Sequence, residues 1–374
     1  MKRQFAIIPL SLLGLAVSLP AAEADFVSLF NGRDLSGWMT EGAPGSFVVR
    51  DGAIYTTGAH PYPAWLRSEQ EYENFVLRFS YKTRGWYEGG FLIHAPLHGP
   101  GSKMGFKLHL RHDRHAYGAR SPGAIYDAAT PLAFPGRGPG QWNRVEVVCD
   151  WPRLRVTLNG TLIHDLDMSQ HPVLRHRLRR GYLGIQNICD NGAWFKDIEI
   201  RPLPGKTGWT DLFADGLAGL TFTGNSKWTF DATTKTLSAR GDNAMAYTRE
   251  SFAAPYELQV WVKTMVNGNG GVTFNDQGGH HVEIQCFNTP DATNPTGSLY
   301  GIAPARRVVS RDEAWFLIQL FNYGRRAEVF VNGERVAGTD ALAPPYHGRV
   351  GFQQHTPRGF IAYRAARLRR LAKP

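Results

Sequence analysis

The sequence predicts an all-β protein made of two tandem β-sandwiches of jelly-roll type. The 374-residue chain contains 41 Gly and 23 Pro, and its short apolar runs are separated by turn residues. Many short strands without regular strand–helix alternation are typical of a sandwich. One repeat of about 170 residues occurs twice, and no shorter period of about 40–50 residues is present. A propeller is therefore disfavoured, and two copies of one sandwich are expected.

The repeat consists of paired segments that keep their order along the chain. The clearest pairs are FSYKT (79–83) with VWVKT (260–264), PGAIYD (122–127) with TGSLYG (296–301), and LGIQN (183–187) with VGFQQ (350–354). The offset between the first residues of the two paired segments shrinks along the chain, from 181 to 174 to 167 residues. The second copy has therefore lost loop residues relative to the first.

Each predicted sandwich has recognisable boundaries. We expect the first over 25–203, a linker over 204–209 that begins with Pro204-Gly205, and a second, more divergent copy over 210–374. Pro and Gly in sequence are typical of a connecting segment. Within the copies, Asn159-Gly160 and Asn332-Gly333 lie between alternating runs and predict tight β-hairpins.

The first 24 residues have the pattern of a signal peptide. Lys2 and Arg3 precede an apolar run over 5–19, and Ala22-Glu23-Ala24 forms a small-residue cleavage site. A membrane-spanning helix needs about 20 apolar residues, whereas this run ends at Pro20. We expect cleavage before Asp25, no membrane span afterwards, and a periplasmic or secreted mature protein.

The net charge is +10, and it becomes +9 once Lys2, Arg3 and Glu23 are removed (10 − 2 + 1). Basic clusters occupy 175–180 and 364–373. In an exported protein they favour a solvated basic surface over nucleic-acid binding. Polyanion binding is a further alternative, and it would require steep salt dependence. Among the three cysteines, only Cys149 and Cys189 share a copy, and isolated thiols are favoured over one bridge.

Two strands have unusually polar faces. In one, Val282, Ile284 and Cys286 alternate with His281, Glu283 and Gln285. A period of two sends these sets to opposite faces of a sheet. In the first copy, Lys107, His109 and Arg111 alternate with apolar residues in the same way. Each polar row is a candidate lining for a groove.

Taken together, these landmarks resemble the 3-keto-disaccharide hydrolase domain family, whose fold is a concanavalin-A-like jelly roll. The matching segments are LFNGRDLSGW (29–38), FVVRDGAIYTTG (47–58), EQEYENFVLRF (69–79), EGGFLIH (88–94), SPGAIYD (121–127), QWNRVEVV (141–148), VTLNG (156–160), LGIQN (183–187) and WFKDIEIRPL (194–203). The resemblance covers nearly all of 26–203 and is looser over 209–373. It implies an enzyme that cleaves glycosides already oxidised to a ketone at sugar carbon 3. Cleavage would proceed by hydrolysis, or by elimination followed by hydration, on a glycoside or oligosaccharide and without a cofactor.

The two copies depart from the family pattern in different places. The family's Glu and Gln on the polar strand remain as Glu283 and Gln285, whereas the first copy has Lys107 and His109. The family's later Gln and His remain as Gln353 and His355. The first copy keeps only the Gln, as Gln186, although its framework matches the family better. Either copy, or a composite of both, is therefore a candidate active site.

The ketone at sugar carbon 3 determines which catalytic side chains the reaction requires. An ordinary glycosidase uses two carboxylates, but the strand at 281–287 offers only Glu283 and the strand at 105–111 offers none. A ketone acidifies the neighbouring C2–H, so one base, a group that stabilises the enolate and an acid for the leaving oxygen suffice.

In the second copy, Glu283 is the predicted base and His355 the predicted acid, and Gln285, Gln353, Tyr300 and Asn275 are predicted to bind substrate. In the first copy, His109 is the predicted base and Lys107 its electrostatic partner. The predicted groove lining of that copy is His94, Glu88, Tyr126, Gln186 and Arg111.

Three other interpretations remain open. A carbohydrate-binding protein without catalytic activity is an alternative, because jelly rolls hold lectins as readily as enzymes. Metal binding by His109, His112 and His115 is disfavoured, since these residues lack the regular spacing of a zinc site. Finally, the polar rows could be solvated strand residues, and a deep pocket beside them would distinguish an enzyme from a shallow binding face.

Overall fold

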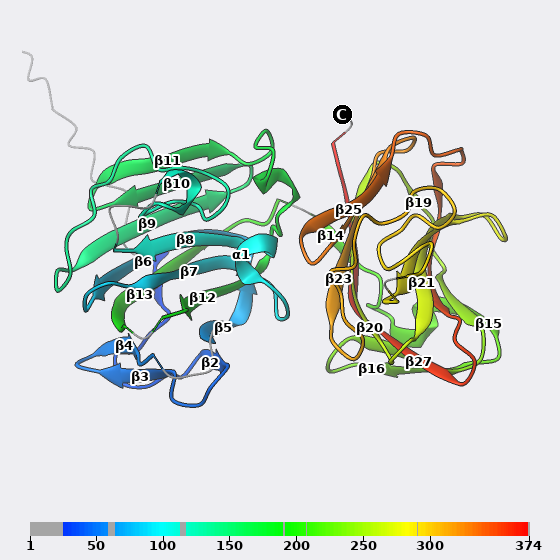
Figure 1. The fold of residues 1–374 in the computed structure, drawn as a ribbon, viewed down its shortest axis with the longest axis horizontal. Coiled ribbons are helices and arrows are strands. Elements are labelled where there is room, and N and C mark those ends of the chain that lie inside the picture. The colour runs from blue at the N-terminus through cyan, green and yellow to red at the C-terminus, as the bar shows by residue number, and fades with distance from the viewer. Residues whose placement is uncertain are drawn as a thin grey trace, which may run out of the picture.

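A computed structural model describes residues 25–58, 64–112, 117–189, 191–206, 208–289 and 291–372. The predicted signal peptide, 1–24, lies outside these residues. Within them, no helix is both long enough and apolar enough to span a bilayer. The structure is all-β, as predicted, and consists of two sandwiches that follow one another along the chain (Figure 1).

The first sandwich, called the first half below, pairs an eight-stranded sheet with a five-stranded sheet. The larger sheet has the order β11 (Thr161–Asp167), β10 (Arg153–Leu158), β9 (Asn143–Asp150), β6 (Asn74–Thr83), β13 (Ala193–Leu203), β4 (Ala53–Thr56) and β3 (Phe47–Arg50), with β1 (Val27–Ser28) paired to β13. The smaller sheet has the order β2 (Trp38–Glu41), β5 (Ala64–Tyr72), β12 (Gly181–Asn187), β7 (Glu88–Ala95) and β8 (Phe106–Arg111).

The second sandwich, the second half, repeats this topology. Its larger sheet has the order β16 (Lys227–Asp231), β17 (Thr236–Gly241), β27 (Gly359–Arg370), β20 (Tyr256–Thr264), β23 (Phe316–Asn322), β24 (Ala327–Val331) and β25 (Glu334–Thr339), with β14 (Trp209–Asp211) paired to β27. Its smaller sheet has the order β15 (Leu220–Gly224), β18 (Ala244–Thr248), β26 (His347–Gln354), β21 (Asn269–Asp276) and β22 (Val282–Phe287), with β19 (Phe252–Ala253) paired to β26. The short helical segments are α1 (Gly101–Met104) and the 3-10 turns η2 (Gly118–Arg120), η3 (Leu174–His176) and η4 (Gly216–Gly219).

Alternation along the strands produces the cores. On β9, for example, Val145, Val147 and Cys149 are buried and alternate with more exposed neighbours. Each half has its own core between its two sheets, with Phe79 and Phe91 stacked in the first and Phe352 against Tyr363 in the second. The separate cores explain why one sequence pattern could be used twice.

The predicted hairpins and thiols are confirmed. Asn159-Gly160 joins β10 to β11, and Asn332-Gly333 joins β24 to β25. All four residues have positive φ angles, as the tight primed turn requires. Cys149, Cys189 and Cys286 are buried free thiols.

The two halves contact each other through a third, smaller apolar cluster. Met104 and Leu178 of the first half pack with Leu317 of the second, and Trp261 lies against them. An ion pair also joins the halves, with Nη1 of Arg367 3.7 Å from Oε2 of Glu71.

Candidate functional site

In the first half, the polar row lies on the face of the smaller sheet that points away from the core. Gln186 on β12 pairs with Trp65 on β5 and with Gly90 on β7, and Gly90 pairs in turn with His109 on β8. Lys107 lies two residues from His109 and therefore shares its face. This face is called the first polar face below.

The second half has a matching face on its smaller sheet, the second polar face. Gln353 on β26 pairs with Met245 on β18 and with Gly271 on β21, and Gly271 pairs with Gln285 on β22. Glu283 lies two residues from Gln285 on the same face. The register thus places Glu283 where the first half has Lys107.

A glycine beside each of these two side chains explains how they lie. A Cβ atom on Gly90 would be 2.6 Å from Cγ of Lys107, and one on Gly271 would be 2.8 Å from Cγ of Glu283. Both side chains therefore fold across a glycine of the neighbouring strand, toward the strand that bears the glutamine. Only glycine leaves room for this approach.

Lys107 is nearly buried on the first polar face. It is 3% exposed, and its Nζ lies 3.8 Å from the centre of the Tyr126 ring. Burial lowers the pKa of Lys107 to about 8, opposed by the charges of Glu88 and Asp127. At neutral pH, a measurable fraction of this amine is uncharged and able to accept a proton.

His109 has a more restrictive environment. Its ring is buried, with Nδ1 3.0 Å from the carbonyl oxygen of Arg120, to which it donates. Burial first, and then the charge of Lys107, lowers the pKa of His109 to about 3. A group with so low a pKa is a weak base, so Lys107 fits the expected role better than His109.

Glu88 and Arg111 lie at one end of the first polar face. Oε1 of Glu88 is 3.7 Å from Nε2 of His109 and 3.7 Å from Nη1 of Arg111. Both side chains are partly exposed. The structure therefore brings together the predicted residues Lys107, His109, Glu88, Arg111 and Tyr126.

A groove of about 430 Å³ lies over the first polar face. Glu41, Trp65 and Gln186 line it from the sheet, and 99–102 line it from the loop that contains α1. The sequence predicted Gln186 in the groove lining, but not Trp65 or Glu41. The order of residues does not show which strands are neighbours. In the structure, Glu41 pairs with Trp65 and Trp65 pairs with Gln186, and this pairing brings the three side chains to one groove.

On the second polar face, the pKa of Glu283 is shifted well away from its ordinary value. Burial raises it to about 7. Gln285 beside it is 5% exposed, whereas Tyr300 is 54% exposed. The backbone N–H of Tyr300 donates to the carbonyl oxygen of Glu283 at 2.9 Å, which holds the Tyr300 segment along β22.

The register separates Glu283 from the predicted acid His355. Glu283 pairs with Thr273, whereas the N–H of His355 bonds to the carbonyl oxygen of Asn269, four residues back along β21. Four residues of strand span about 13 Å. Glu283 is on β22, whereas His355 directly follows β26, on the other side of β21. These two side chains do not form a direct proton-transfer pair in this structure.

His94 and Asn275 lie inside the halves rather than on the polar faces. They occupy equivalent positions with positive φ angles of 53° and 55°, where the strand register shifts. His94 is 2% exposed, with its ring nitrogens 3.1 Å from the Leu178 carbonyl oxygen and 2.7 Å from that of Glu73. Asn275 is 3% exposed and accepts a hydrogen bond from Asn322. The predicted contacts of these two residues with a substrate at the polar faces are therefore unsupported, because the bulge turns both side chains inward.

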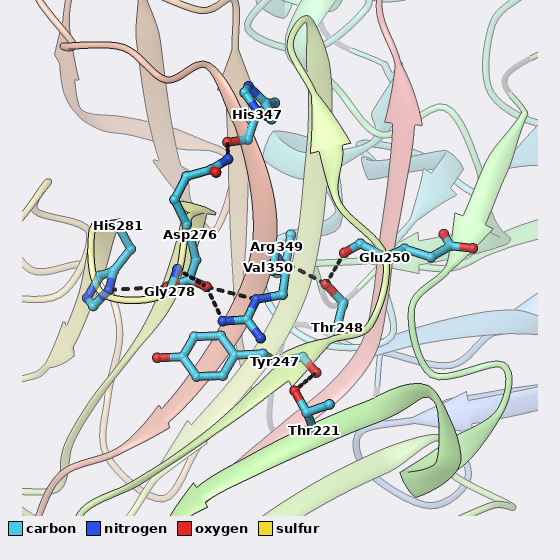
Figure 2. Close-up of polar contacts among 11 residues, drawn as sticks. Thr221, Tyr247, Thr248, Glu250, Asp276, Gly278, His281, His347, Arg349 and Val350 are labelled. Atoms are coloured by element: carbon cyan, nitrogen blue, oxygen red, sulfur yellow. Dashed lines mark hydrogen bonds and ion pairs between the residues drawn. The ribbon is translucent and has the colours of Figure 1, made fainter.

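An ion-pair cluster missed by sequence reasoning borders the second polar face (Figure 2). Nε of Arg349 lies 2.9 Å from Oδ2 of the buried Asp276, and the guanidinium is 4.4 Å from the centre of the Tyr247 ring. Nδ1 of His281 lies 3.8 Å from the other carboxylate oxygen, Oδ1. Figure 2 shows Arg349 between the carboxylate and the aromatic ring.

The first half has the same kind of cluster, but the strands that bear the arginine and the tyrosine are exchanged. Arg67 lies 4.7 Å from the centre of the Tyr182 ring and bonds to Glu41 at 2.8 Å. Arg67 pairs with Gly184 in the register position where Tyr247 pairs with Gly351. The arginine is therefore on β5 in the first half and on β26, the counterpart of β12, in the second.

The described residues contain no group of three or more His, Cys, Asp and Glu side chains that could hold a metal ion. The side chains described on the two faces are an amine, an imidazole, a guanidinium, carboxyl groups, amides and aromatic rings. This defines a class: a tandem jelly-roll protein with a polar face on the smaller sheet of each half.

The comparisons identify the family. The 3-keto-alpha-glucoside-1,2-lyase-like domain matches residues 25–201 and again 208–369, and the chain belongs to this family. The family suspected from the sequence motifs is confirmed. Among curated proteins, none matches the chain significantly.

Solved structures resemble one half of the chain at a time. A protein from Parabacteroides distasonis, named provisionally as a glycosyl hydrolase, is 20% identical, with 48% of this chain and 94% of that chain covered and a TM-score of 0.43. The carbohydrate-binding module CBM66 from Bacillus subtilis is 11% identical, with coverages of 43% and 95% and a TM-score of 0.32. A galectin-like protein from Bacillus subtilis is 12% identical, with coverages of 45% and 99% and a TM-score of 0.36.

Proposed function

We propose that the protein is an exported enzyme that cleaves glycosides carrying a ketone at sugar carbon 3. The proposal assigns proton transfer to Glu283 on the second polar face and to Lys107 on the first. Gln285, Gln353 and Gln186 would orient the sugar through their amide groups. Family membership supports the substrate class.

One observation carries the proposal. Lys107 and Glu283 occupy the same register position in the two halves, and each side chain lies across a glycine of the neighbouring strand. Burial brings the pKa of the first down to about 8 and that of the second up to about 7. Enzymes tune lysine and glutamate to this range when they serve as proton acceptors near neutral pH.

The proposed reaction is an elimination. The base takes the C2 proton, the C2–H electron pair forms the enolate with the C3 carbonyl, and the enolate then expels the aglycone from C1. The electron pair of the C1–O bond leaves with the aglycone oxygen, which takes up a proton. Addition of water across the resulting C1–C2 double bond completes a net hydrolysis.

The test uses the full chain with 3-keto-trehalose or a 3-keto-glucoside beside the unoxidised sugar. We expect turnover of the keto sugar only. Lys107→Met should decrease the turnover contributed by the first half at least tenfold, and Glu283→Gln should do the same for the second half. The double variant should lose turnover. Matched controls are Lys227→Met and Glu250→Gln, whose exposed side chains lie outside both rows. Wild-type rates in the double variant would refute the residue assignment, and turnover of only the unoxidised sugar would refute the substrate class.

Carbohydrate binding without cleavage is the second candidate. The groove beside Trp65 favours it, because an aromatic ring next to an amide such as Gln186 is suited to a sugar face and its hydroxyl groups. Saturable binding of both the oxidised and the unoxidised sugar without product formation would support this candidate over the enzyme.

A further inference from the structure

The groove over the first polar face has one wall that does not come from the sheet. This wall belongs to the segment 98–104, called the wall segment below, which includes α1. Residues 99–102 line the groove directly. The shape of the groove therefore depends on what holds the wall segment in place.

On one side, the wall segment is held by its own half. Nη1 of Arg177 donates to the carbonyl oxygen of Ser102 at 2.7 Å, and the N–H of Leu178 donates to the carbonyl oxygen of Met104 at 2.7 Å. A Cβ atom on Gly101 would lie 3.2 Å from Leu92, so α1 packs closely on the sheet.

On the other side, the wall segment is held by the larger sheet of the second half. Met104 is fully buried in the cluster with Leu317, beside Trp261. The ring of His98 lies 5.6 Å from that of Trp261 and 6.3 Å from that of Trp315, measured between centroids. The buried anchor of α1 is therefore shared between the halves.

The hairpin turn Asn332-Gly333 of the second half also lies against the wall segment. A Cβ atom on Gly333 would lie 2.8 Å from the carbonyl oxygen of Lys103 and 2.9 Å from Cγ of Met104. Gly99, in the groove lining, would place a Cβ atom 3.7 Å from Oδ1 of Asn332. The turn thus lies beside the wall segment both near Gly99 and near Lys103.

From these contacts we infer that the second half positions the sugar groove of the first half, with the Asn332-Gly333 turn as its positioning element. The inference rests on the proposed function, from which it takes a 3-keto-glycoside as the substrate. It gives the tandem arrangement a purpose beyond duplication, since one repeat completes the binding site of the other.

The loop lengths support this asymmetry. Ten residues, 96–105, connect β7 to β8, whereas five residues, 277–281, connect β21 to β22. The loop of the second half is thus half as long, so it cannot form a wall as long as the wall segment beside the second polar face. The longer loop of the first half is the one that reaches the partner half.

The test compares Gly333→Ala with Gly160→Ala in the full chain. The two glycines hold the same place in equivalent hairpins, with φ of +77° and +80°, so the backbone strain of an alanine is matched. A Cβ atom on Gly160 meets nothing within 4 Å. Any difference between the variants therefore reports the contact with the wall segment.

We expect Gly333→Ala to speed amide hydrogen exchange over 98–105 at least fivefold. With all kinetic constants measured in a Glu283→Gln background, which leaves turnover to the first half, it should raise KM for the 3-keto-glucoside at least threefold and change kcat less than twofold. Gly160→Ala should leave both readouts as in the unmodified protein. His98→Ala is a second variant that leaves the hairpin intact, and it should change both readouts in the direction of Gly333→Ala. Equal exchange over 98–105 in Gly333→Ala and Gly160→Ala would overturn the inference, as would faster exchange with an unchanged KM. Absence of turnover by the unmodified protein would refute the proposed function alone, because the exchange rates still decide whether the turn holds the wall.

Discussion

At the scale of single residues, burial makes a lysine and a glutamate chemically similar. Desolvation disfavours the charged form of either group, so it lowers the pKa of Lys107 to about 8 and raises that of Glu283 to about 7. The two halves thus place different residues in one register position and reach nearly the same proton affinity.

This similarity predicts the pH dependence of turnover. In Lys107→Met, the remaining base is Glu283, and its deprotonated fraction grows as pH rises through about 7. In Glu283→Gln, the remaining base is Lys107, so the corresponding rise should move to about 8. Initial rates between pH 5 and 9.5 would measure both midpoints. Identical midpoints in the two variants would contradict the assignment of separate bases.

Glu283 also predicts a pH-dependent stability. Its pKa is about 7 in the folded protein, against 4.5 as its ordinary value, so the folded state binds more protons between these values. The free energy of unfolding therefore falls as pH rises from 4.5 to 7, by up to about 3 kcal/mol. Glutamine does not titrate, so Glu283→Gln should be about as stable as the unmodified protein at pH 4.5 and more stable at pH 8. Urea unfolding at the two pH values measures this, and a pH-independent difference would refute it.

At the scale of the strands, the position of each candidate base depends on a glycine of the neighbouring strand. Gly271→Ala would place a methyl group against the side chain of Glu283, which is flexible and would move away. We expect at least a tenfold decrease in the turnover contributed by the second half, measured in a Lys107→Met background. The unfolding free energy should change by less than about 1.5 kcal/mol, because the atoms displaced belong to one side chain. Gly85→Ala is the control, since its Cβ atom would meet nothing within 4 Å and its φ is not positive.

The strands also show where sequence reasoning succeeds and where it fails. Alternation and the repeat can be read directly from the residue order, so they predicted the sandwiches and the hairpins. The family's strand pattern aligned Lys107 with Glu283, and the strand register places them at equivalent positions. Alternation cannot reveal a bulge, and the bulges at His94 and Asn275 turn both side chains inward. It also cannot predict which strands are neighbours, and that pairing places Glu41 and Trp65 in the groove.

At the scale of the whole molecule, the two basic clusters are partly internal. Sequence reasoning expected solvated surfaces at 175–180 and 364–373, and this is wrong for several members. Arg369 is 3% exposed and bonds to the buried Glu257, and Arg367 reaches Glu71 across the contact between the halves. Arg177 holds the wall segment. Part of the positive charge therefore stabilises internal contacts instead of attracting a partner.

The shared apolar cluster predicts a stability effect between the halves. Leu317→Ala should lower the unfolding free energy by about 2–4 kcal/mol, because Leu317 is 1% exposed and its removal leaves a cavity against Met104 and Leu178. Leu132→Ala is the control, since that side chain is 70% exposed and should change the value by less than about 0.5 kcal/mol. Denaturant unfolding of both variants measures the difference. Equal values would show that the halves do not stabilise each other through this cluster.

The exchanged arginine and tyrosine have a consequence for assembly of the chain. Tandem repeats of one fold risk pairing a strand of one copy with the partner strand of the other while the chain is still incomplete. If β5 paired with β26, Arg67 would meet Arg349, and two like charges would repel each other. If β18 paired with β12, Tyr247 would meet Tyr182 without a cation between them. Only the correct partners place an arginine against a tyrosine in both halves, so the exchange favours folding of each copy onto itself.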